Sequence, residues 1–368
     1  AERAAWGVGP SAGSQSRGLV TGAPRTVRVI DPAASPFPGT DARQIAAIDL
    51  GSNSFHLAIA RVRGDEIAML DSVRDQVQLA KGLGKRKRLT KAASRRALNC
   101  LTRFSQRLRH VPSERVRAVG TNTLRRAKDK ADFLAEAEAA LGHPIEIISG
   151  REEARLIYLG VAHSLADEPG PRLVVDIGGG STELILGERF EALDVHSLEM
   201  GCVSMTRRFF PKGEITDQAM QTTPLRAARE LQTMERAFRE SGWTQAAGAS
   251  GTIRTVGKIL SAHGWSDDGI TKAGLKKLRK AVVSAKHTSR LKLSGLKSAR
   301  APVFPGGLAI LLALFERLGV EHMEVSPGAL REGVMYDLLG RIRHEDVRER
   351  TIRSFQTRYR VDAAQAAR

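Results

Sequence analysis

The sequence has few of the residues that stabilise secreted proteins or anchor membrane proteins. It contains two cysteines, Cys100 and Cys202, with no CxxC pair and no neighbouring histidine cluster, which excludes a disulfide framework and a structural zinc site. No apolar run approaches the roughly 20 residues that span a bilayer, and no N-terminal segment has the length and flanks of a signal peptide. These absences predict a soluble, cytoplasmic protein that does not bind a membrane.

Acidic residues are missing from two long stretches. Residues 76–110 hold 11 Lys and Arg with no Asp or Glu, and residues 269–315 hold 10, again with no acid, within a chain of net charge +18. Such stretches favour a polyanionic partner, namely nucleic acid, anionic headgroups or a phosphate-rich substrate, although a solvated helical face gives the same pattern. Aromatic residues make up only 5% of the chain and do not alternate with the Lys/Arg runs, so nucleic acid is not the expected partner.

One local pattern occurs twice, at residues 47–54 (AIDLGSNS) and at residues 174–183 (VVDIGGGSTE). In each copy an apolar strand ends in Asp-(Leu/Ile)-Gly, passes through small residues and enters a second apolar run. The glycines let backbone N–H groups approach an oxyanion, the hydroxyls add donors, and the aspartate can hold a divalent cation or its waters. The pair predicts two related half-domains that face each other across a phosphate-sized cleft.

Strands and helices alternate along the rest of the chain, which predicts an α/β fold. Residues 1–41 are rich in Ala, Gly, Ser and Pro and are interpreted as a disordered or artificial tail. Residues 90–110 have apolar side chains three and four apart and are expected to form an amphipathic helix with a basic outer face. Further predicted strands are 116–119, 145–148 and 322–325, and further predicted helices are 151–163, 217–240 and 308–318. Glycine-rich turns precede helices at 248–252 and 328–333, positions suited to anion binding or to helix capping.

The chain resembles the exopolyphosphatase/guanosine pentaphosphate phosphatase (Ppx/GppA) family. The resemblance rests on segments 48–56, 120–125, 148–155, 176–183, 248–252 and 328–333, in family order from about Gln44 to the C-terminus. It implies two actin-like (ribonuclease H-like) lobes facing across a phosphate-binding cleft, with lobe I at 42–155 and lobe II at 156–342. Residues 343–368 would be the start of a C-terminal helical extension. Longer members continue into a helical domain with a His-Asp pair that this chain lacks, so dimerisation and processivity stay open.

The resemblance also implies roles for individual residues. Glu153 would activate the attacking water, Glu183 would assist through magnesium or that water, and Arg125 would bind substrate phosphate. Asp49, Asp176 and Glu183 would hold Mg²⁺, and a monovalent cation such as K⁺ is left open. The phosphate-binding residues would be Gly51, Ser52, Asn53, Ser54, Gly178, Gly179, Gly180, Ser181, Thr182, Ser250, Gly251 and Thr252. His56 and Cys202 are interpreted as packing residues.

These roles agree with the chemistry of phosphoryl transfer to water, which needs positioning, neutralisation of phosphate oxygens and one base. There is no Walker lysine loop, no reactive-cysteine motif and no Ser-His-Asp order, so no covalent intermediate is expected. The predicted function is Mg²⁺-dependent release of terminal phosphate from inorganic polyphosphate. The alternatives are a guanosine pentaphosphate 5'-phosphohydrolase, which would need a purine pocket, an actin-like kinase, which would need an acceptor site, and a non-catalytic polyanion-binding protein.

Overall fold

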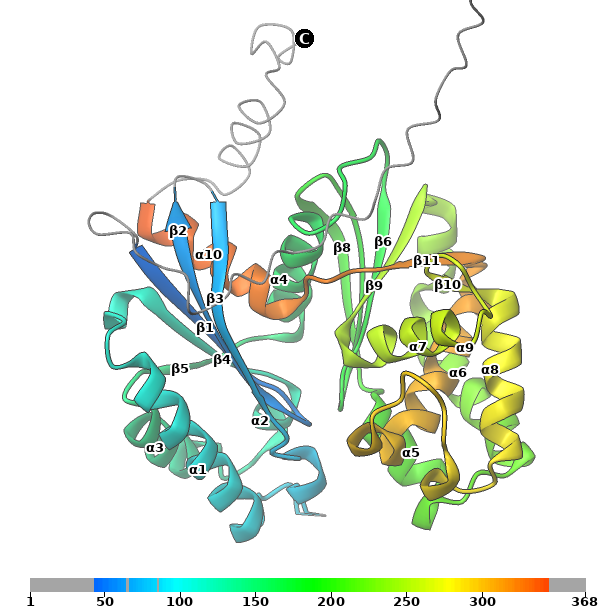
Figure 1. Ribbon diagram of the computed structural model, residues 1–368, viewed down its shortest axis with the longest axis horizontal. Helices are drawn as coiled ribbons and strands as arrows, with labels where there is room; N and C mark the ends of the chain where they lie inside the picture. The colour runs from blue at the N-terminus through cyan, green and yellow to red at the C-terminus, as the bar shows by residue number, and fades with distance from the viewer. Residues whose placement is uncertain (1–42, 64–65, 85, 344–368) are drawn as a thin grey trace, which may run out of the picture. The chain divides into compact units, whose positions relative to one another are not determined.

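The computed structural model describes residues 43–63, 66–84 and 86–343 and contains two β-sheets with helices packed against them (Figure 1). The tail predicted at 1–41 and the helical segment predicted at 343–368, apart from its first residue, lie outside the described residues.

The first sheet has the strand order β3-β2-β1-β4-β5. Its strand β2 pairs antiparallel with β1 and β3, whereas β1, β4 and β5 run parallel. The strands are β1 (Arg43–Leu50), β2 (Phe55–Arg63), β3 (Glu66–Asp75), β4 (Val116–Gly120) and β5 (Ile145–Ile147).

The second sheet repeats this topology. Its order is β10-β11-β9-β6-β7-β8, with β7 antiparallel to β6 and β8, and with β6, β9 and β11 parallel. Strands β8-β7-β6-β9-β11 therefore correspond to β3-β2-β1-β4-β5, and β10 adds an antiparallel edge. The two related halves predicted from the sequence repeat are confirmed. The strands are β6 (Arg172–Ile177), β7 (Thr182–Glu188), β8 (Glu191–Leu198), β9 (Gln245–Ala249), β10 (Ile270–Thr271) and β11 (His322–Val325).

Helices follow or connect the strands of both sheets. They are α1 (Lys91–Leu108), α2 (Asn122–Arg126), α3 (Lys130–Leu141), α4 (Gly150–Ala162), α5 (Cys202–Phe209), α6 (Asp217–Ser241), α7 (Ser250–Ala262), α8 (Lys272–Ser284), α9 (Phe304–Leu318) and α10 (Leu330–Arg343). Helix α1 begins after Thr90, whose side chain accepts a hydrogen bond from the N–H of Ala93, and it buries the apolar stripe that its periodicity predicts. The 3₁₀ turns are η1 (Ala80–Gly82), η2 (Ser113–Arg115), η3 (Pro211–Gly213), η4 (Thr288–Arg290) and η5 (Ser298–Val303).

Helices α4 and α10 follow the last parallel strand of their sheets and cross each other at Gly160 and Gly333. A Cβ atom added at either glycine would overlap the backbone of the other helix, so glycine lets the two backbones touch. Both helices join a hydrophobic cluster that also contains residues of β1, β6 and β9. Helix α10 packs against β1 and β4 as well as against α4. The crossing therefore links the two sheets, and the predicted domain boundary at 155/156 stays a prediction.

One helical stretch, Ser298–Leu318, is long and apolar enough to cross a membrane by length and composition alone, but 67% of its apolar 18-residue window is buried inside the protein. It joins η5 to α9, which packs against α5 and α6 in the core of the second half. Its apolar composition follows from this burial.

Candidate active site

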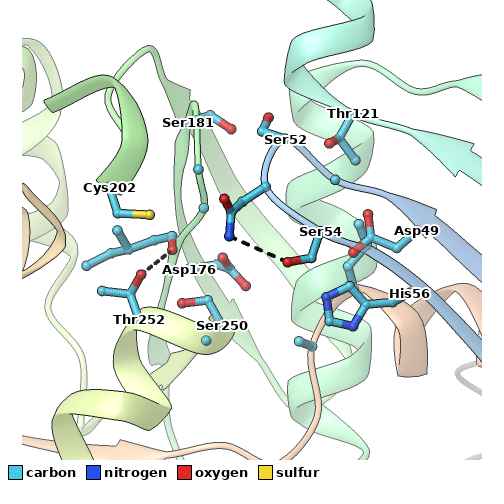
Figure 2. Close-up of a pocket in the computed structure, with 18 of the residues that line it drawn as sticks. Asp49, Ser52, Ser54, His56, Thr121, Asp176, Ser181, Cys202, Ser250 and Thr252 are labelled. Atoms are coloured by element: carbon cyan, nitrogen blue, oxygen red, sulfur yellow. Dashed lines mark hydrogen bonds between the residues drawn. The ribbon is translucent and has the colours of Figure 1, made fainter. Parts of the chain in front are cut away.

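The carboxyl ends of the parallel strands of both sheets converge on one pocket of about 130 Å³ (Figure 2). Its wall is formed by the turns after β1 and β6 and by the starts of α4, α7 and α10. Most of the predicted site residues line it: Asp49, Gly51, Ser52, Asn53, Ser54, Glu153, Asp176, Gly178, Gly179, Ser181, Ser250, Gly251 and Thr252. The predicted residues Arg125, Gly180, Thr182 and Glu183 are not part of the wall.

In the turn after β1, neighbouring backbone fixes the orientation of two peptide groups. The N–H of Ala80 donates to the carbonyl of Ser52 at 2.8 Å, and the N–H of Gln78 donates to the carbonyl of Asn53 at 2.9 Å. Because a peptide group is planar and trans, the N–H groups of Asn53 and Ser54 point away from these donors. We infer that they face the pocket that the same residues line.

The turn after β6 is held in the same way by the start of α5. The N–H of Cys202 donates to the carbonyl of Gly178, and the N–H of Val203 donates to the carbonyl of Gly179, both at 2.9 Å. The N–H groups of Gly179 and Gly180 therefore point away from α5. The two turns thus hold N–H groups in equivalent positions, and those of Asn53, Ser54 and Gly179 belong to residues that line the pocket, which suits binding of an anion such as phosphate.

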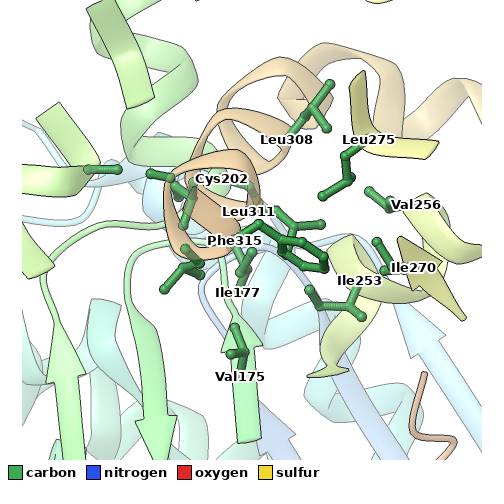
Figure 3. Close-up of a cluster of buried hydrophobic side chains, with 14 of the residues drawn as sticks. Val175, Ile177, Cys202, Ile253, Val256, Ile270, Leu275, Leu308, Leu311 and Phe315 are labelled. Carbon is green, nitrogen blue, oxygen red and sulfur yellow. The ribbon is translucent and has the colours of Figure 1, made fainter. Parts of the chain in front are cut away.

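The second turn rests on the core. Figure 3 shows Ile177 and Cys202 beside Leu311 and Phe315 of α9, all members of one buried cluster. The hydroxyl of Thr252 donates to the carbonyl of Ile177 at 3.1 Å and so ties α7 to the end of β6. Both cysteines of the chain are free and buried, and Cys202 also lines the pocket. The packing predicted for Cys202 is therefore observed, at a position that supports the site.

Ser250, at the start of α7, has a φ angle of +77°. A non-glycine residue in this left-handed region is strained by about 1–3 kcal/mol, and such residues cluster at functional sites. This backbone conformation turns the chain sharply from β9 into α7 at the pocket wall.

Glu153 lies in the first turn of α4 and is buried beside Arg125. The guanidinium of Arg125 donates to a carboxylate oxygen of Glu153 at 2.7 Å and to the carbonyl of Ile148 at 3.0 Å. Burial raises the pKa of Glu153, and the charge and hydrogen bond of Arg125 oppose this. Arg125 therefore orients a buried carboxylate whose proton affinity exceeds that of an exposed glutamate.

Glu183 and Thr182 are buried in β7 rather than at the pocket wall. The carboxylate of Glu183 accepts a hydrogen bond from the hydroxyl of Ser197 at 2.9 Å, and burial together with the charges of Glu153 and Asp176 raises its pKa. The hydroxyl of Thr182 donates to the carbonyl of Met200 at 2.7 Å. The roles predicted for these two residues stay predictions.

Asp49 and Asp176 occupy equivalent positions in β1 and β6 and both line the pocket. Burial is the main cause that raises the pKa of Asp49 to about 8 and the pKa of Asp176 to about 7, and the charge of Glu153 adds to both shifts. One oxygen of Asp49 is buried without a hydrogen-bond partner. Such carboxylates fit a Mg²⁺ ion, which prefers oxygen ligands and one or two carboxylates alongside substrate phosphate. Among the described residues no three His, Cys, Asp or Glu side chains are grouped to hold a metal by themselves.

A cluster of arginines at the pocket was not predicted from the sequence. Arg74, Arg254, Arg300 and Arg331 line the pocket, although they come from β3, α7, η5 and α10. Burial lowers the pKa of Arg254 and of Arg300, and mutual repulsion within the cluster adds to this. A local signal exists only for Arg331, in the turn at 328–333, and for Arg254, one helical turn after Ser250. The cluster is suited to the negative oxygens of a phosphate chain.

His56 also lines the pocket, although only a packing role was predicted for it. Its Nδ1 atom is buried without a hydrogen-bond partner. Burial, together with the charges of Arg331 and Arg74, lowers the pKa of His56 to about 2. The imidazole is therefore neutral at physiological pH and leaves the arginines as the cationic groups of this wall.

The chain matches the Ppx/GppA phosphatase family over residues 58–342. It belongs to this family. It is 46% identical over 319 residues to the guanosine-5'-triphosphate,3'-diphosphate pyrophosphatase of Vibrio cholerae. The matched region covers 87% of this chain and 64% of that protein. The protein of the same name from Vibrio vulnificus is 44% identical over 318 residues, with 86% and 64% covered. The chain thus spans less than two thirds of the length of these curated relatives.

Solved structures of the family have the same fold. The exopolyphosphatase from Cytophaga hutchinsonii superposes with a TM-score of 0.74 at 28% identity, covering 83% of this chain and 99% of that one. The Aquifex aeolicus PPX-GPPA enzyme gives a TM-score of 0.68 at 27% identity, covering 80% and 99%. The predicted family and two-lobed α/β fold are therefore confirmed, and the chain is a member of a family of phosphatases.

Proposed function

We propose that this protein hydrolyses the terminal phosphoanhydride bond of guanosine 5'-triphosphate 3'-diphosphate at its 5' end. The observation that carries the proposal is the buried Glu153–Arg125 pair beside a pocket with two N–H turns and four arginines. The substrate is suggested by the names of the Vibrio relatives. This corrects the preference drawn from the sequence, because relatives at 43–46% identity carry the guanosine name and the exopolyphosphatase is only 28% identical.

In this proposal the N–H groups of the two turns hold the terminal phosphate, and Arg254, Arg300 and Arg331 neutralise its oxygens. Glu153 accepts a proton from the water that attacks the terminal phosphorus, and the bond to the bridging oxygen breaks. Arg125 acts as a positioning residue that fixes the carboxylate of Glu153. A raised pKa suits Glu153 to this role, because a base works best when its pKa lies near the working pH.

Asp49 and Asp176 would hold Mg²⁺. By its predicted role, Glu183 would supply a third carboxylate. When bound, the cation would neutralise phosphate oxygens as charge develops on the leaving group. The unpartnered oxygen of Asp49 supports this assignment. A monovalent cation, a homodimer and a cytoplasmic location remain predictions.

Inorganic polyphosphate is the second candidate substrate. It is favoured by the likeness to a solved exopolyphosphatase and by the two acid-free stretches, since a polyanion gains affinity from displaced counterions. Both substrates would use the same pocket for the terminal phosphate.

The test is phosphate release with excess Mg²⁺ from guanosine pentaphosphate, long-chain polyphosphate and GTP in parallel. The proposal predicts the highest kcat/KM for guanosine pentaphosphate, with guanosine 5'-diphosphate 3'-diphosphate as the other product. A higher kcat/KM for polyphosphate would favour the second candidate. Phosphate transfer that requires an added alcohol would indicate a kinase and overturn both.

A further inference from the structure

His56 is a pocket residue that has no role in the function proposed above. It lies on β2, just after the first phosphate turn, and Figure 2 shows its imidazole directed into the pocket beside Asp49 and Ser54. Its Nδ1 atom is buried without a hydrogen-bond partner, and among the described residues no hydrogen bond involves its Nε2 atom. Polar groups inside proteins are rarely left unpaired, so an unpaired imidazole in this wall is suited to bind a ligand.

His56 belongs to a row of three polar side chains that crosses the first sheet. It pairs with Asp49 on β1 and with Arg74 on β3. Side chains of directly paired residues lie on the same face of a sheet, and all three line the pocket. The guanidinium of Arg74 donates to the hydroxyl of Ser54 at 3.0 Å. The row therefore brings a carboxylate, an imidazole and a guanidinium to one wall of the pocket.

The equivalent row of the second sheet has different chemistry. There Asp176 pairs with Glu183, and Glu183 pairs with Ser197. Glu183 is therefore the counterpart of His56, but its carboxylate accepts a hydrogen bond from Ser197 and does not line the pocket. A carboxylate at position 56 would repel a phosphate, whereas an imidazole N–H can donate to it. At this position the first half presents a donor where the second half buries an acid.

The surroundings of the imidazole indicate which nitrogen carries its proton. Burial and the charges of the arginine cluster hold the pKa of His56 far below neutral, so the ring carries a single proton. On Nδ1 this proton would belong to a buried donor without an acceptor, which is costly. A bare Nδ1 atom instead presents a lone pair, which the nearby arginine charges stabilise. The proton is therefore assigned to Nε2, the nitrogen that is open to the pocket.

We propose that His56 is a substrate-contacting residue whose Nε2–H donates a hydrogen bond to an oxygen of the phosphate group bound in the pocket. The inference rests on the proposed function only in that the pocket binds a phosphate. Arginines reach the phosphate through long side chains, whereas the imidazole is short and stands on a strand, so its hydrogen bond fixes the orientation of the phosphate. It also adds a donor without adding to the repulsion among the four arginines.

The direct test is NMR of protein in which only the nine histidines carry ¹⁵N, titrated with inorganic phosphate in the presence of Mg²⁺. The ring signals of His56 are identified by their loss in His56→Gln. They should show the proton on Nε2 and shift saturably as phosphate is added. His263 is the matched control, because its Nε2 atom is also buried without a partner, it stacks on Trp265 at 4.6 Å, and it does not line the pocket. Constant His56 signals throughout the titration, or an equal shift at His263, would overturn the inference.

Three variants at position 56 separate a hydrogen-bond donor from a packing residue. Glutamine carries its amide N–H near the position of Nε2, whereas leucine has a similar size and no polar group. The affinity for inorganic phosphate is expected to fall about tenfold in His56→Leu, as for the loss of one hydrogen bond to a charged group, and to stay within about threefold of the wild type in His56→Gln. His56→Glu, which copies the second half, should lose more than His56→Leu, and His263→Leu should bind as the wild type does.

Thermal unfolding of each variant shows whether it is folded. Equal phosphate affinities in folded His56→Leu and His56→Gln proteins would make His56 a packing residue and overturn the inference. Phosphate binding is measured without turnover, so a selective loss in His56→Leu supports the contact even if guanosine pentaphosphate proves not to be a substrate. Failure of the proposed function would appear instead in the comparison of substrates.

Discussion

At the residue scale, the pocket gathers like charges that repel each other unless an anion is present. Arg254 and Arg300 are half-buried, and the cluster lowers their pKa together with burial. Arg74 donates to the hydroxyl of Ser54 at 3.0 Å, and Arg331 donates to the hydroxyl of Ser72 at 3.0 Å. Arg331 also forms an ion pair with Glu332 at 3.4 Å, whereas the hydroxyl partner of Arg74 is neutral. The charge of the cluster is therefore only partly compensated, so binding of a phosphate relieves repulsion as well as forming hydrogen bonds.

Replacing Arg300 by Gln is expected to lower kcat/KM for guanosine pentaphosphate about ten- to a hundredfold, because a hydrogen bond to a charged group contributes about 1.5–3 kcal/mol. Arg300→Lys should recover part of this loss, since it restores the charge but not the planar donor geometry. The measurement is steady-state phosphate release. The exposed Arg290, replaced by Gln, is the control and should leave kcat/KM unchanged; an equal loss there would contradict a specific role for Arg300.

Replacing Gly201 by Ala is expected to displace the turn after β6, which contains Gly179 and Gly180. The backbone of Gly201 is extended, with φ −146°, so alanine is conformationally acceptable, but its Cβ would lie 2.5 Å from the carbonyl atoms of Gly179 and 2.6 Å from the N of Gly180. A misplacement of about 1 Å can lower a rate about a hundredfold.

The measurement for Gly201→Ala is kcat/KM beside the thermal unfolding temperature. Gly257→Ala on α7 serves as the control, because its Cβ would meet only the side chain of Val325. Activity that survives in a folded Gly201→Ala protein would show that the turn tolerates this shift.

At the element scale, the sequence predicted the parts whose signal is local. The repeated turns, the amphipathic helix α1, and the strands β4 and β11 follow from periodicity and glycine placement. The arginine cluster could not be predicted, because Arg74 and Arg331 lie 257 positions apart and only tertiary packing brings them together. The interpretation of His56 as a packing residue alone was incomplete, because the sequence of a strand does not show which of its faces lines a cavity.

The crossing of α4 and α10 is reinforced by an ionic network around the buried carboxylate of Asp337. Its carboxylate accepts hydrogen bonds from Arg117 at 2.7 Å, Arg155 at 2.5 Å and Arg341 at 2.6 Å. Burial raises the pKa of Asp337, but the hydrogen bond of Arg155 and the three arginine charges outweigh it and hold the pKa below its usual value. The network ties α10 to β4 and to α4. Pocket residues follow the end of β4 and lie at the starts of α4 and α10.

Replacing Asp337 by Asn is expected to lower the free energy of unfolding by about 1.5–3 kcal/mol at pH 7, because it removes the charged acceptor of a hydrogen bond from the buried Arg117, which keeps Glu146 as a partner. Since the folded-state pKa lies below the unfolded one, this contribution is present above about pH 4 and is lost as the pH falls through the folded-state pKa. Urea unfolding at pH 7 and at lower pH measures it, with the exposed Asp267→Asn as control. A stability difference that grows on acidification would contradict this sign.

At the scale of the whole molecule, two copies of one topology bring equivalent groups to a single site. Asp49 and Asp176, the turns after β1 and β6, and the starts of α4 and α10 occur once in each half and meet at the pocket. The halves are not equivalent in chemistry, because α4 carries the buried Glu153 whereas α10 carries Arg331. In the proposed function the repeat would position the phosphate, and its asymmetry would provide a base on one side and a cation on the other.

The measurement that tests this account most directly is kcat for phosphate release by Glu153→Gln beside its neighbour variant Glu152→Gln. Glu152 accepts hydrogen bonds from Arg155 and does not line the pocket. Because general-base catalysis contributes about 10²–10⁴-fold, kcat should fall by that factor in Glu153→Gln and by less than about twofold in Glu152→Gln, with both proteins folded. Equal activities in the two variants, or a larger loss in Glu152→Gln, would contradict the assignment of Glu153 as the base.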